Sequence, residues 1–136
     1  MATTPNSIIT PQAVKAATVA FGASANTNLV TPTNTTLLAT AGANGGRLTR
    51  LEALASATQA ATQVQFYSSV DGGTTKTLIR ASAFPAYTLA TTTTSPVLDM
   101  GYSDTLPLIL LAAERIYIGS AVAVTGLNAR AEWGDY

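Results

Sequence analysis

The sequence predicts an all-β protein: a single antiparallel β-sandwich of jelly-roll type, preceded by an extended N-terminal arm. First, about seven or eight short segments along the 136-residue chain place apolar residues at alternate positions. Second, clusters of Gly, Asn, Asp and Pro separate these segments as turns. Third, Thr, which favours strands, is unusually abundant, and the length suits one domain.

Residues 1–14 are expected to form the arm, and residues 15–136 the sandwich domain. The first segment contains two prolines, which bias the residues before them toward extended backbone, and no charged residue. Such a segment cannot form a core by itself, so a docking arm and a frayed terminus are the two alternatives. A pair of isoleucines between the prolines favours the arm. The predicted partner-binding residues are therefore Pro5, Ile8, Ile9 and Pro11.

The first half of the domain alternates weak strand candidates with loops. Residues 15–21 are a weak strand candidate, residues 22–34 are a loop by composition, and residues 35–40 are β-prone. Asn44-Gly45-Gly46 tolerates positive φ and predicts a hairpin turn that joins residues 35–40 to the next strand.

Residues 47–63 fit two patterns. Leucines at helical spacing and a high content of Ala, Leu, Glu and Gln favour a helix. The preceding turn and the β-rich surroundings favour a strand. We favour the strand, at least for residues 47–55.

The second half contains the clearest strands. Alternating runs at residues 63–67 and 75–80 flank Asp71-Gly72-Gly73 and predict a β-hairpin. Further strand candidates lie at residues 86–91, 96–99, 106–110, 116–124 and 127–133. Phe66 and Trp133 fall on apolar faces and are expected in the core. Tyr67 and Tyr117 fall on the opposite faces and are expected to be available for a sugar or a protein partner.

Composition removes most catalytic and metal-binding chemistry. With no His and no Cys, the usual general base, the cysteine nucleophile and the thiolate zinc site are all missing. The acids are the remaining candidates for a catalytic pair, but Asp71, Asp104 and Glu114 lie in predicted turns. Glu132 lies beside Arg130 on the polar face of a predicted strand, which predicts a cross-strand ion pair or an interface contact. We therefore expect no enzyme activity, no cofactor and no metal.

The charge pattern limits the classes of partner. Seven basic and seven acidic residues give a net charge of zero, which argues against nucleic acid. The longest purely apolar run, residues 108–113, is far below the roughly 20 residues of a membrane helix, and residues 1–6 do not resemble a secretory signal. Charged residues make up only 10% of the chain, which suits a protein whose surface is covered by neighbours.

The segment Ser69-Val70-Asp71-Gly72-Gly73-Thr74-Thr75 resembles the Asp box of sialidases, in which Ser and Asp bond the backbone of a hairpin turn. Thr75 replaces the tryptophan of that motif, and the motif occurs once. The resemblance therefore implies a hairpin and does not imply a sialidase.

Longer stretches resemble the small virion proteins of tailed bacteriophages, whose genes lie near the capsid genes. The matching stretches are residues 4–12, 40–51, 71–76, 101–105, 107–118 and 131–136. Together they span most of the chain. The resemblance implies a β-sandwich on or within the virion, and it supports a strand at residues 47–55.

Within that group the chain is most similar to capsid decoration (cement) proteins. This implies a protein that is made in the cytoplasm of the bacterial host and binds the major capsid protein on the outer surface of the virion. It would act as a homo-oligomer, expected to be a trimer, and stabilise the shell against the pressure of packaged DNA. The alternative is a tail, fibre or head-spike module that binds a host receptor or glycan.

Overall fold

The structure, a computed structural model, describes residues 11–136. Within these residues the chain forms nine strands and no helix, so no helix there is suited to crossing a membrane. The strands are β1 (Ala13–Ala20), β2 (Thr36–Thr40), β3 (Gly46–Ala55), β4 (Thr62–Ser69), β5 (Thr77–Phe84), β6 (Val97–Asp99), β7 (Leu108–Leu110), β8 (Arg115–Ser120) and β9 (Leu127–Asp135).

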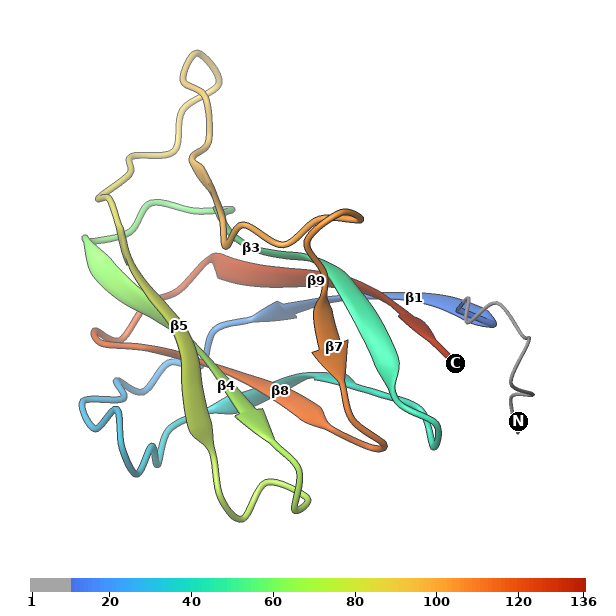
Figure 1. The fold of residues 1–136 in the computed structure, drawn as a ribbon. Helices are drawn as coiled ribbons and strands as arrows, with labels where there is room; N and C mark the ends of the chain where they lie inside the picture. The colour runs from blue at the N-terminus through green and yellow to red at the C-terminus, as the bar shows by residue number, and fades with distance from the viewer. Residues whose placement is uncertain (1–10) are drawn as a thin grey trace.

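Two antiparallel sheets pack face to face (Figure 1), which confirms the predicted all-β sandwich. Sheet A has the order β1-β9-β3-β6, with β7 also paired to β3. Sheet B has the order β2-β8-β4-β5. The longest pairing joins β3 to β9, so the centre of sheet A is built from segments that are far apart in the sequence.

The core lies between the sheets and is formed by alternate residues of the central strands. Leu48 and Leu51 of β3 face Ile116 and Ile118 of β8, and all four are fully buried. Each such side chain contributes about 1.5–3 kcal/mol by leaving water. Phe66 is also fully buried, and Trp133 nearly so, which confirms both core predictions.

The strand at residues 47–55 is confirmed, against its helical propensity. β3 has partners on both sides, β9 on one and β6 and β7 on the other. A central strand of this kind gains backbone hydrogen bonds and buries its leucines against the opposite sheet. These tertiary interactions outweigh a propensity difference of a few tenths of a kcal/mol per residue.

The expected hairpin at Asn44-Gly45-Gly46 is wrong, although the turn itself exists. The turn leads from β2 in sheet B to β3 in sheet A, so the strands it joins do not pair. Gly45 has a φ of 80°, and a Cβ there would lie 2.5 Å from the carbonyl oxygen of Leu110. The glycine signal therefore reflects a close crossing between sheets and not a two-stranded ladder.

Other segments also differ from the predictions. Residues 86–91 form no strand and contribute only the isolated bridge between Tyr87 and Gln59. β8 ends at Ser120, because the N–H of Val122 turns away to bond the hydroxyl of Thr62. Of the expected arm, residues 1–10 lie outside the described residues, and Ala13 and Val14 already belong to β1.

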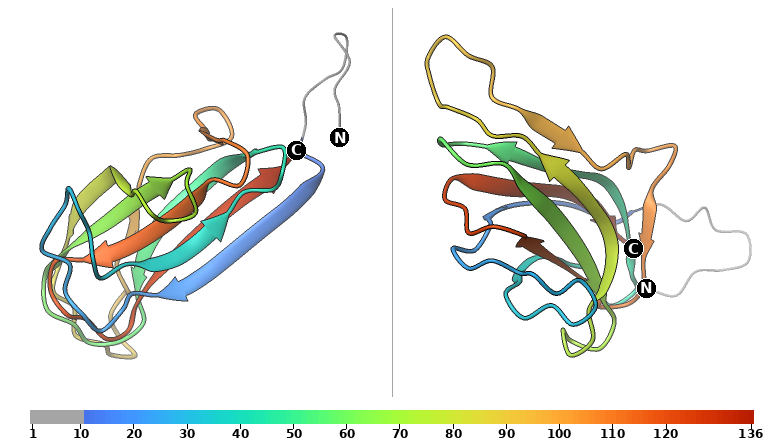
Figure 2. Two further views of the ribbon diagram at one scale, coloured as in Figure 1. Left: turned by 90° about the horizontal axis from the view of Figure 1, so that it is seen from below. Right: turned by 90° about the vertical axis from the view of Figure 1, so that its left-hand side faces the viewer.

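The sandwich has two distinct ends (Figure 2). We call the end formed by loops 21–35, 56–61, 85–96 and 121–126 the distal end. The terminal end lies opposite and contains loops 41–45, 70–76 and 111–114, together with the start of β1 and the end of β9.

Candidate functional site

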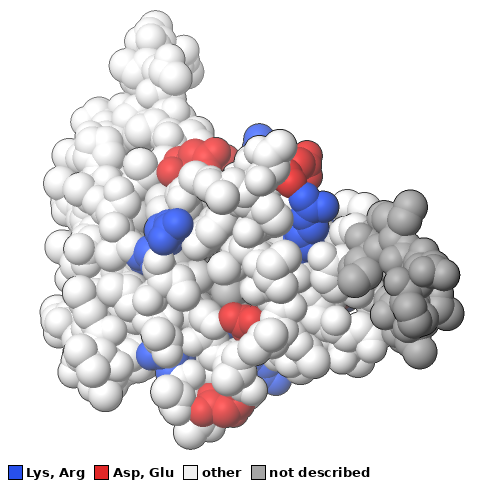
Figure 3. Space-filling model, viewed as in Figure 1, with Lys and Arg blue, Asp and Glu red and all other residues white. Residues whose placement is uncertain are grey.

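The distal end is free of charged residues. None of its four loops contains Asp, Glu, Lys or Arg. In Figure 3 this end, at the left and in the upper projection, carries no blue or red atoms. The rest of the molecule carries all 14 charged side chains. The distal end is therefore the surface that a partner can cover at the lowest electrostatic cost of desolvation.

Backbone contacts join the distal loops to one another. The N–H of Ser56 donates to the carbonyl of Gly126 at 2.6 Å. Gln59 and Tyr87 exchange two backbone hydrogen bonds, at 2.9 and 3.1 Å. Gly126, at a φ of 80°, lies so close to the neighbouring loop that an added Cβ would be 2.2 Å from the Cβ of Ala57. The distal end is therefore a packed surface and not a set of independent loops.

Loop 21–35 folds over the outer face of sheet B and is held there by Asn26. The Asn26 side-chain amide is fully buried and donates to Gln65 Oε1 and to the Tyr67 hydroxyl, each at 2.8 Å. Gly119, opposite Gln65 in the sheet, leaves the space that the loop occupies. Burial raises the pKa of Tyr67, and the hydrogen bond from Asn26 offsets part of that rise.

The expectation that Tyr67 is available to a partner is therefore wrong. Its outward-facing position is covered by loop 21–35, and the side chain is fully buried. Tyr117 is half-buried, and the ammonium group of Lys76 lies 4.9 Å from its ring centre.

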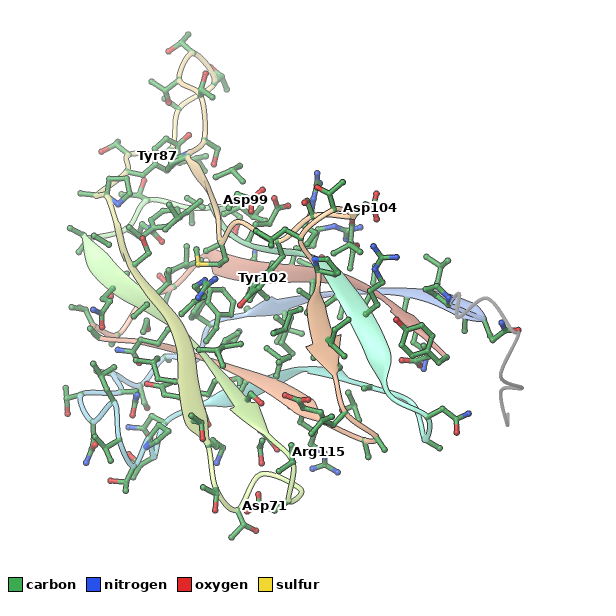
Figure 4. The ribbon with its side chains drawn as sticks, in the orientation of Figure 1. Asp71, Tyr87, Asp99, Tyr102, Asp104 and Arg115 are labelled. Atoms are coloured by element: carbon green, nitrogen blue, oxygen red, sulfur yellow. The ribbon has the colours of Figure 1, made fainter. Side chains whose placement is uncertain are left out.

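The distal end exposes aliphatic and hydroxyl side chains. Val30 is 83% exposed, Leu89 53% and Val122 43%. Residues 85–96 project from the sandwich, with Tyr87 at the base of the projection (Figure 4) and four consecutive threonines, residues 91–94, exposed toward its tip. Beneath it, both amide atoms of the buried Gln59 side chain have no hydrogen-bond partner among the described residues.

At the terminal end, charged groups organise the chain. Lys15 Nζ lies 2.5 Å from Asp135 Oδ2, and the N–H of Gly42 donates to Asp135 Oδ1 at 2.9 Å. Burial raises the pKa of Asp135, but the ion pair and the backbone hydrogen bond outweigh it, so the net pKa is lowered. Glu114, also buried, accepts hydrogen bonds from the Ser68 hydroxyl and from the N–H of Leu111.

The hairpin between β4 and β5 is confirmed, as is the bonding that its resemblance to an Asp box implies. The carboxylate of Asp71 accepts from the N–H of Thr75 and from the hydroxyl of Ser69. Ser69 Oγ in turn accepts from the N–H of Gly73. The backbone bond from Thr75, followed by the Ser69 bond, lowers the pKa of Asp71 to about 2.

The outer face of sheet A carries a second group of charges. Glu132 forms ion pairs, one of the two expected alternatives: Arg130 of the same strand lies 3.2 Å away, and Arg50 of the neighbouring β3 lies 3.8 Å away. Beside them is a pocket of about 250 Å³, lined by Thr49, Arg50, Asp99, Tyr102, Ser103, Asp104 and Glu132. The labelled members Asp99, Tyr102 and Asp104 lie on one side of the molecule in Figure 4.

Of the predicted arm residues, only Pro11 lies within the described part of the chain. It is half-buried and packs closely on Gly134 of β9: a Cβ added at Gly134 would lie only 2.3 Å from the Cβ of Pro11. Pro5, Ile8 and Ile9 lie outside the described residues.

The distal end is not among the sites that the sequence predicts, although a signal is present in it. Four long stretches without charge, residues 16–46, 53–70, 81–98 and 116–129, each contain one of the distal loops.

Within residues 11–136 no group of three acidic side chains is placed to hold a metal ion. Comparison of the chain with protein-family models, with curated proteins and with solved structures finds no match.

Proposed function

We propose that this protein is a non-catalytic structural component of a bacteriophage virion, a decoration (cement) protein on the capsid surface. It is made in the host cytoplasm, binds the major capsid protein from outside and stabilises the shell. The distal end is the surface through which it binds.

The observation that carries the proposal is the absence of charge from all four distal loops. Covering a charged side chain costs several kcal/mol unless it meets a well-placed partner, and the cores of protein interfaces are depleted of charged residues. Val30, Leu89 and Val122 are exposed, and each Å² of their apolar surface that a partner covers contributes about 25 cal/mol to the free energy of binding. The hydrogen bonds of Asn26 order the surface in advance, which lowers the entropy cost of binding.

The fold proposed for this role is a jelly roll. The strand orders β1-β9-β3-β6 and β2-β8-β4-β5 support it, because each sheet alternates strands from the two halves of the chain. Jelly rolls occur in viral capsid proteins and in lectins, and the fold alone therefore does not decide between a shell protein and a glycan-binding module.

The proposed partners are the major capsid protein and further copies of this chain, as a trimer at threefold or quasi-threefold points. Residues 1–12, the part of the expected arm that precedes β1, add contacts to a neighbouring subunit through Pro5, Ile8 and Ile9. An extended segment satisfies its backbone groups when it joins the edge of a sheet. Pro11 at the base of this segment rests on Gly134 of β9, which gives the arm a fixed point of departure.

The test is binding to shells assembled from the major capsid protein of the same virus and lacking this protein. Val30→Lys places one charge on the distal end, and Val70→Lys is the matched control at the terminal end, where Val70 is 63% exposed. We expect Val30→Lys to reduce shell occupancy at least about tenfold, because a buried unpaired charge opposes binding, and Val70→Lys to bind normally. Deletion of residues 1–12 is expected to leave a folded protein that no longer coats shells.

Copy number separates this proposal from its main rival. Hundreds of copies per virion, counted by cryo-EM, are expected of a decoration protein, whereas a handful would assign the chain to a tail, fibre or spike. Full occupancy by the Val30→Lys variant would move the binding surface away from the distal end.

The pocket on sheet A favours the second candidate function, glycan binding by a tail, fibre or head-spike module. Asp99, Asp104 and Ser103 offer polar groups of the kind that bind sugar hydroxyls. The ring of Tyr102 is less suited to stacking on a sugar, because the guanidinium of Arg80 already lies 5.0 Å from its centre. A host-glycan array probed with the normal protein and with Asp104→Asn tests this role: binding lost in the variant supports it.

A further inference from the structure

β1 is an edge strand that the described part of the chain leaves open on one side. It pairs with β9 through eight consecutive residue pairs without a bulge, and no other strand within residues 11–136 pairs with it. In the left view of Figure 2, β1 runs along the margin of the molecule. Its side chains are mostly small or aliphatic, and Val14 is 92% exposed.

The register identifies which backbone groups of β1 have no strand partner within residues 11–136. The N–H of Phe21 donates to the carbonyl of Leu127 at 2.8 Å, which continues the β1–β9 register by one pair. Because hydrogen-bonded pairs alternate in an antiparallel ladder, the odd-numbered residues of β1 bond β9. The even-numbered residues therefore point their N–H and C=O groups away from the sheet. These residues are Val14, Ala16, Thr18 and Ala20.

The other sheet edges carry features that discourage pairing, and β1 does not. β2 has five residues and a bulge, and the edge formed by β6 and β7 is split into two strands of three residues. β5 has a register shift against β4 and an exposed arginine, Arg80. The single charge on β1, Lys15, is already held by Asp135. Long, regular edges without such features pair with other strands.

We propose that β1 pairs antiparallel with β1 of a second copy of this chain, about a two-fold axis at Ala17. Val14 then lies opposite Ala20 of the second copy, and Ala16 opposite its Thr18, so every free backbone group of the strand gains a partner. Lys15 lies opposite Val19 of the second copy, which keeps the two ammonium groups apart. The two A sheets become one continuous sheet.

A second copy is the occupant that fits because the edge is self-complementary. The register that centres on Ala17 uses all four outward-facing residues and brings no like charges together. The side chains that meet on the outer face, those of Val14, Ala16, Thr18 and Ala20, are small enough for close pairing. The inference does not rest on the capsid proposal: the pairing is a two-fold contact that forms in purified protein without shells, and it is separate from the threefold contacts proposed on the shell.

The test uses the full chain, which has no native cysteine. Ala17→Cys places two thiols beside each other across the axis, in a pair whose Cα atoms lie about 4.5 Å apart. Val14→Cys is the matched control on the same strand, where the two thiols are separated by six residues, or roughly 20 Å. Under mild oxidation we expect Ala17→Cys to form a disulfide-linked dimer at least about tenfold faster than Val14→Cys.

Sedimentation of the unmodified protein provides the second measurement. We expect a monomer–dimer equilibrium between low micromolar and about 1 mM protein, and Ala16→Pro, which removes an outward N–H but no bond to β9, to weaken it at least about tenfold. Equal cross-linking of the two cysteine variants would overturn the proposal, as would a protein that stays monomeric. Loss of the dimer on deletion of residues 1–10 would also overturn it, because it would assign the edge to the N-terminal segment of a neighbour.

Discussion

The distal and terminal ends of the sandwich expose similar aliphatic side chains but differ in charge. Val30 and Leu89 are exposed at the distal end, and Val70 and Leu111 at the terminal end. At the terminal end these residues lie among carboxylates and ammonium groups that are bonded to the backbone or to one another. At the distal end the neighbours are Thr, Ala, Ser and amide side chains. Apolar exposure alone therefore does not distinguish the two surfaces.

The two ends also differ in how they are held together. The distal end depends on close packing and on uncharged hydrogen bonds, such as those of Asn26. The terminal end depends on ionised groups, such as Asp135 with Lys15 and Asp71 with its own turn. Acid should therefore weaken the terminal end, whereas substitutions that change the size or shape of a side chain should weaken the distal end. Four predictions separate these two behaviours.

The largest expected effect compares two glycines with nearly the same backbone conformation. Gly126 has a φ of 80° at the distal end and Gly72 a φ of 75° at the terminal end. A Cβ at Gly126 would be 2.2 Å from the Cβ of Ala57, whereas a Cβ at Gly72 would meet nothing within 4 Å. Gly126→Ala should lower the free energy of unfolding by about 3 kcal/mol or more, and Gly72→Ala by about 1 kcal/mol. Urea denaturation measures both, and equal losses would contradict close packing at the distal end.

The second prediction concerns the hydrogen bonds of the distal end. Asn26→Ala leaves Gln65 Oε1 and the Tyr67 hydroxyl buried with fewer partners, and it releases loop 21–35. We expect the free energy of unfolding to fall by about 2–3 kcal/mol. Asn34→Ala is the control, because Asn34 makes an exposed hydrogen bond to the Ala25 carbonyl in the same loop. That variant should lose less than about 1 kcal/mol, and similar losses in the two variants would rule out a special role for the buried amide.

Sequence reasoning predicted the strands with regular alternation and failed where distant segments meet. The run at residues 127–133 alternates cleanly because it forms a central strand with one face in the core. Apart from the β4–β5 hairpin, the partners of the strands were not predictable, since pairs such as β3 and β9 join segments separated by more than half of the chain. The turn at Gly45 shows the same limit: a local glycine signal reports positive φ, but it does not report which sheet the next strand joins.

The candidate site was predictable only in part, and for a physical reason. The absence of charge was visible in four separate stretches, but their meeting at one end depends on the topology of the sandwich. Tyr67 illustrates the remaining gap. Its place on the outer face follows from the period of two, whereas its burial follows from a loop that carries one buried asparagine and no local signal for docking.

The third prediction tests the terminal end with acid. The pKa of Asp135 in the folded protein is below its ordinary value of 3.8, so its contribution to stability is fully present above pH 3.8 and is lost as the pH falls toward the folded pKa. Lys15→Met removes the ion pair and should cost about 1 kcal/mol at pH 7, a modest figure because Lys15 is half exposed. The difference between the variant and the normal protein should shrink below pH 3.8.

Lys76→Met is the matched control, because the ammonium of Lys76 contacts the ring of Tyr117 and the carbonyl of Gly73 and forms no ion pair within residues 11–136. Its effect should be constant across the same pH range. Urea denaturation at several pH values measures both variants. A Lys15→Met effect that does not change with pH would contradict an ionic terminal end.

The smallest expected effect has the opposite sign and belongs to the distal end. Gln59 is buried, and both of its side-chain amide atoms lack a partner among the described residues. Gln59→Met keeps the length of the side chain and removes the buried polar atoms, so the free energy of unfolding should rise by about 1 kcal/mol. Gln65→Met is the control: Gln65 is also buried but is hydrogen-bonded to Asn26 and Tyr67, and the same substitution there should destabilise the protein. If both variants lose stability, the Gln59 amide is hydrogen-bonded in solution, as the Gln65 amide is. If only Gln65→Met loses stability, loop 21–35 is held by the Asn26 hydrogen bonds, whereas the Gln59 side chain beneath the projection is held by packing and not by hydrogen bonds.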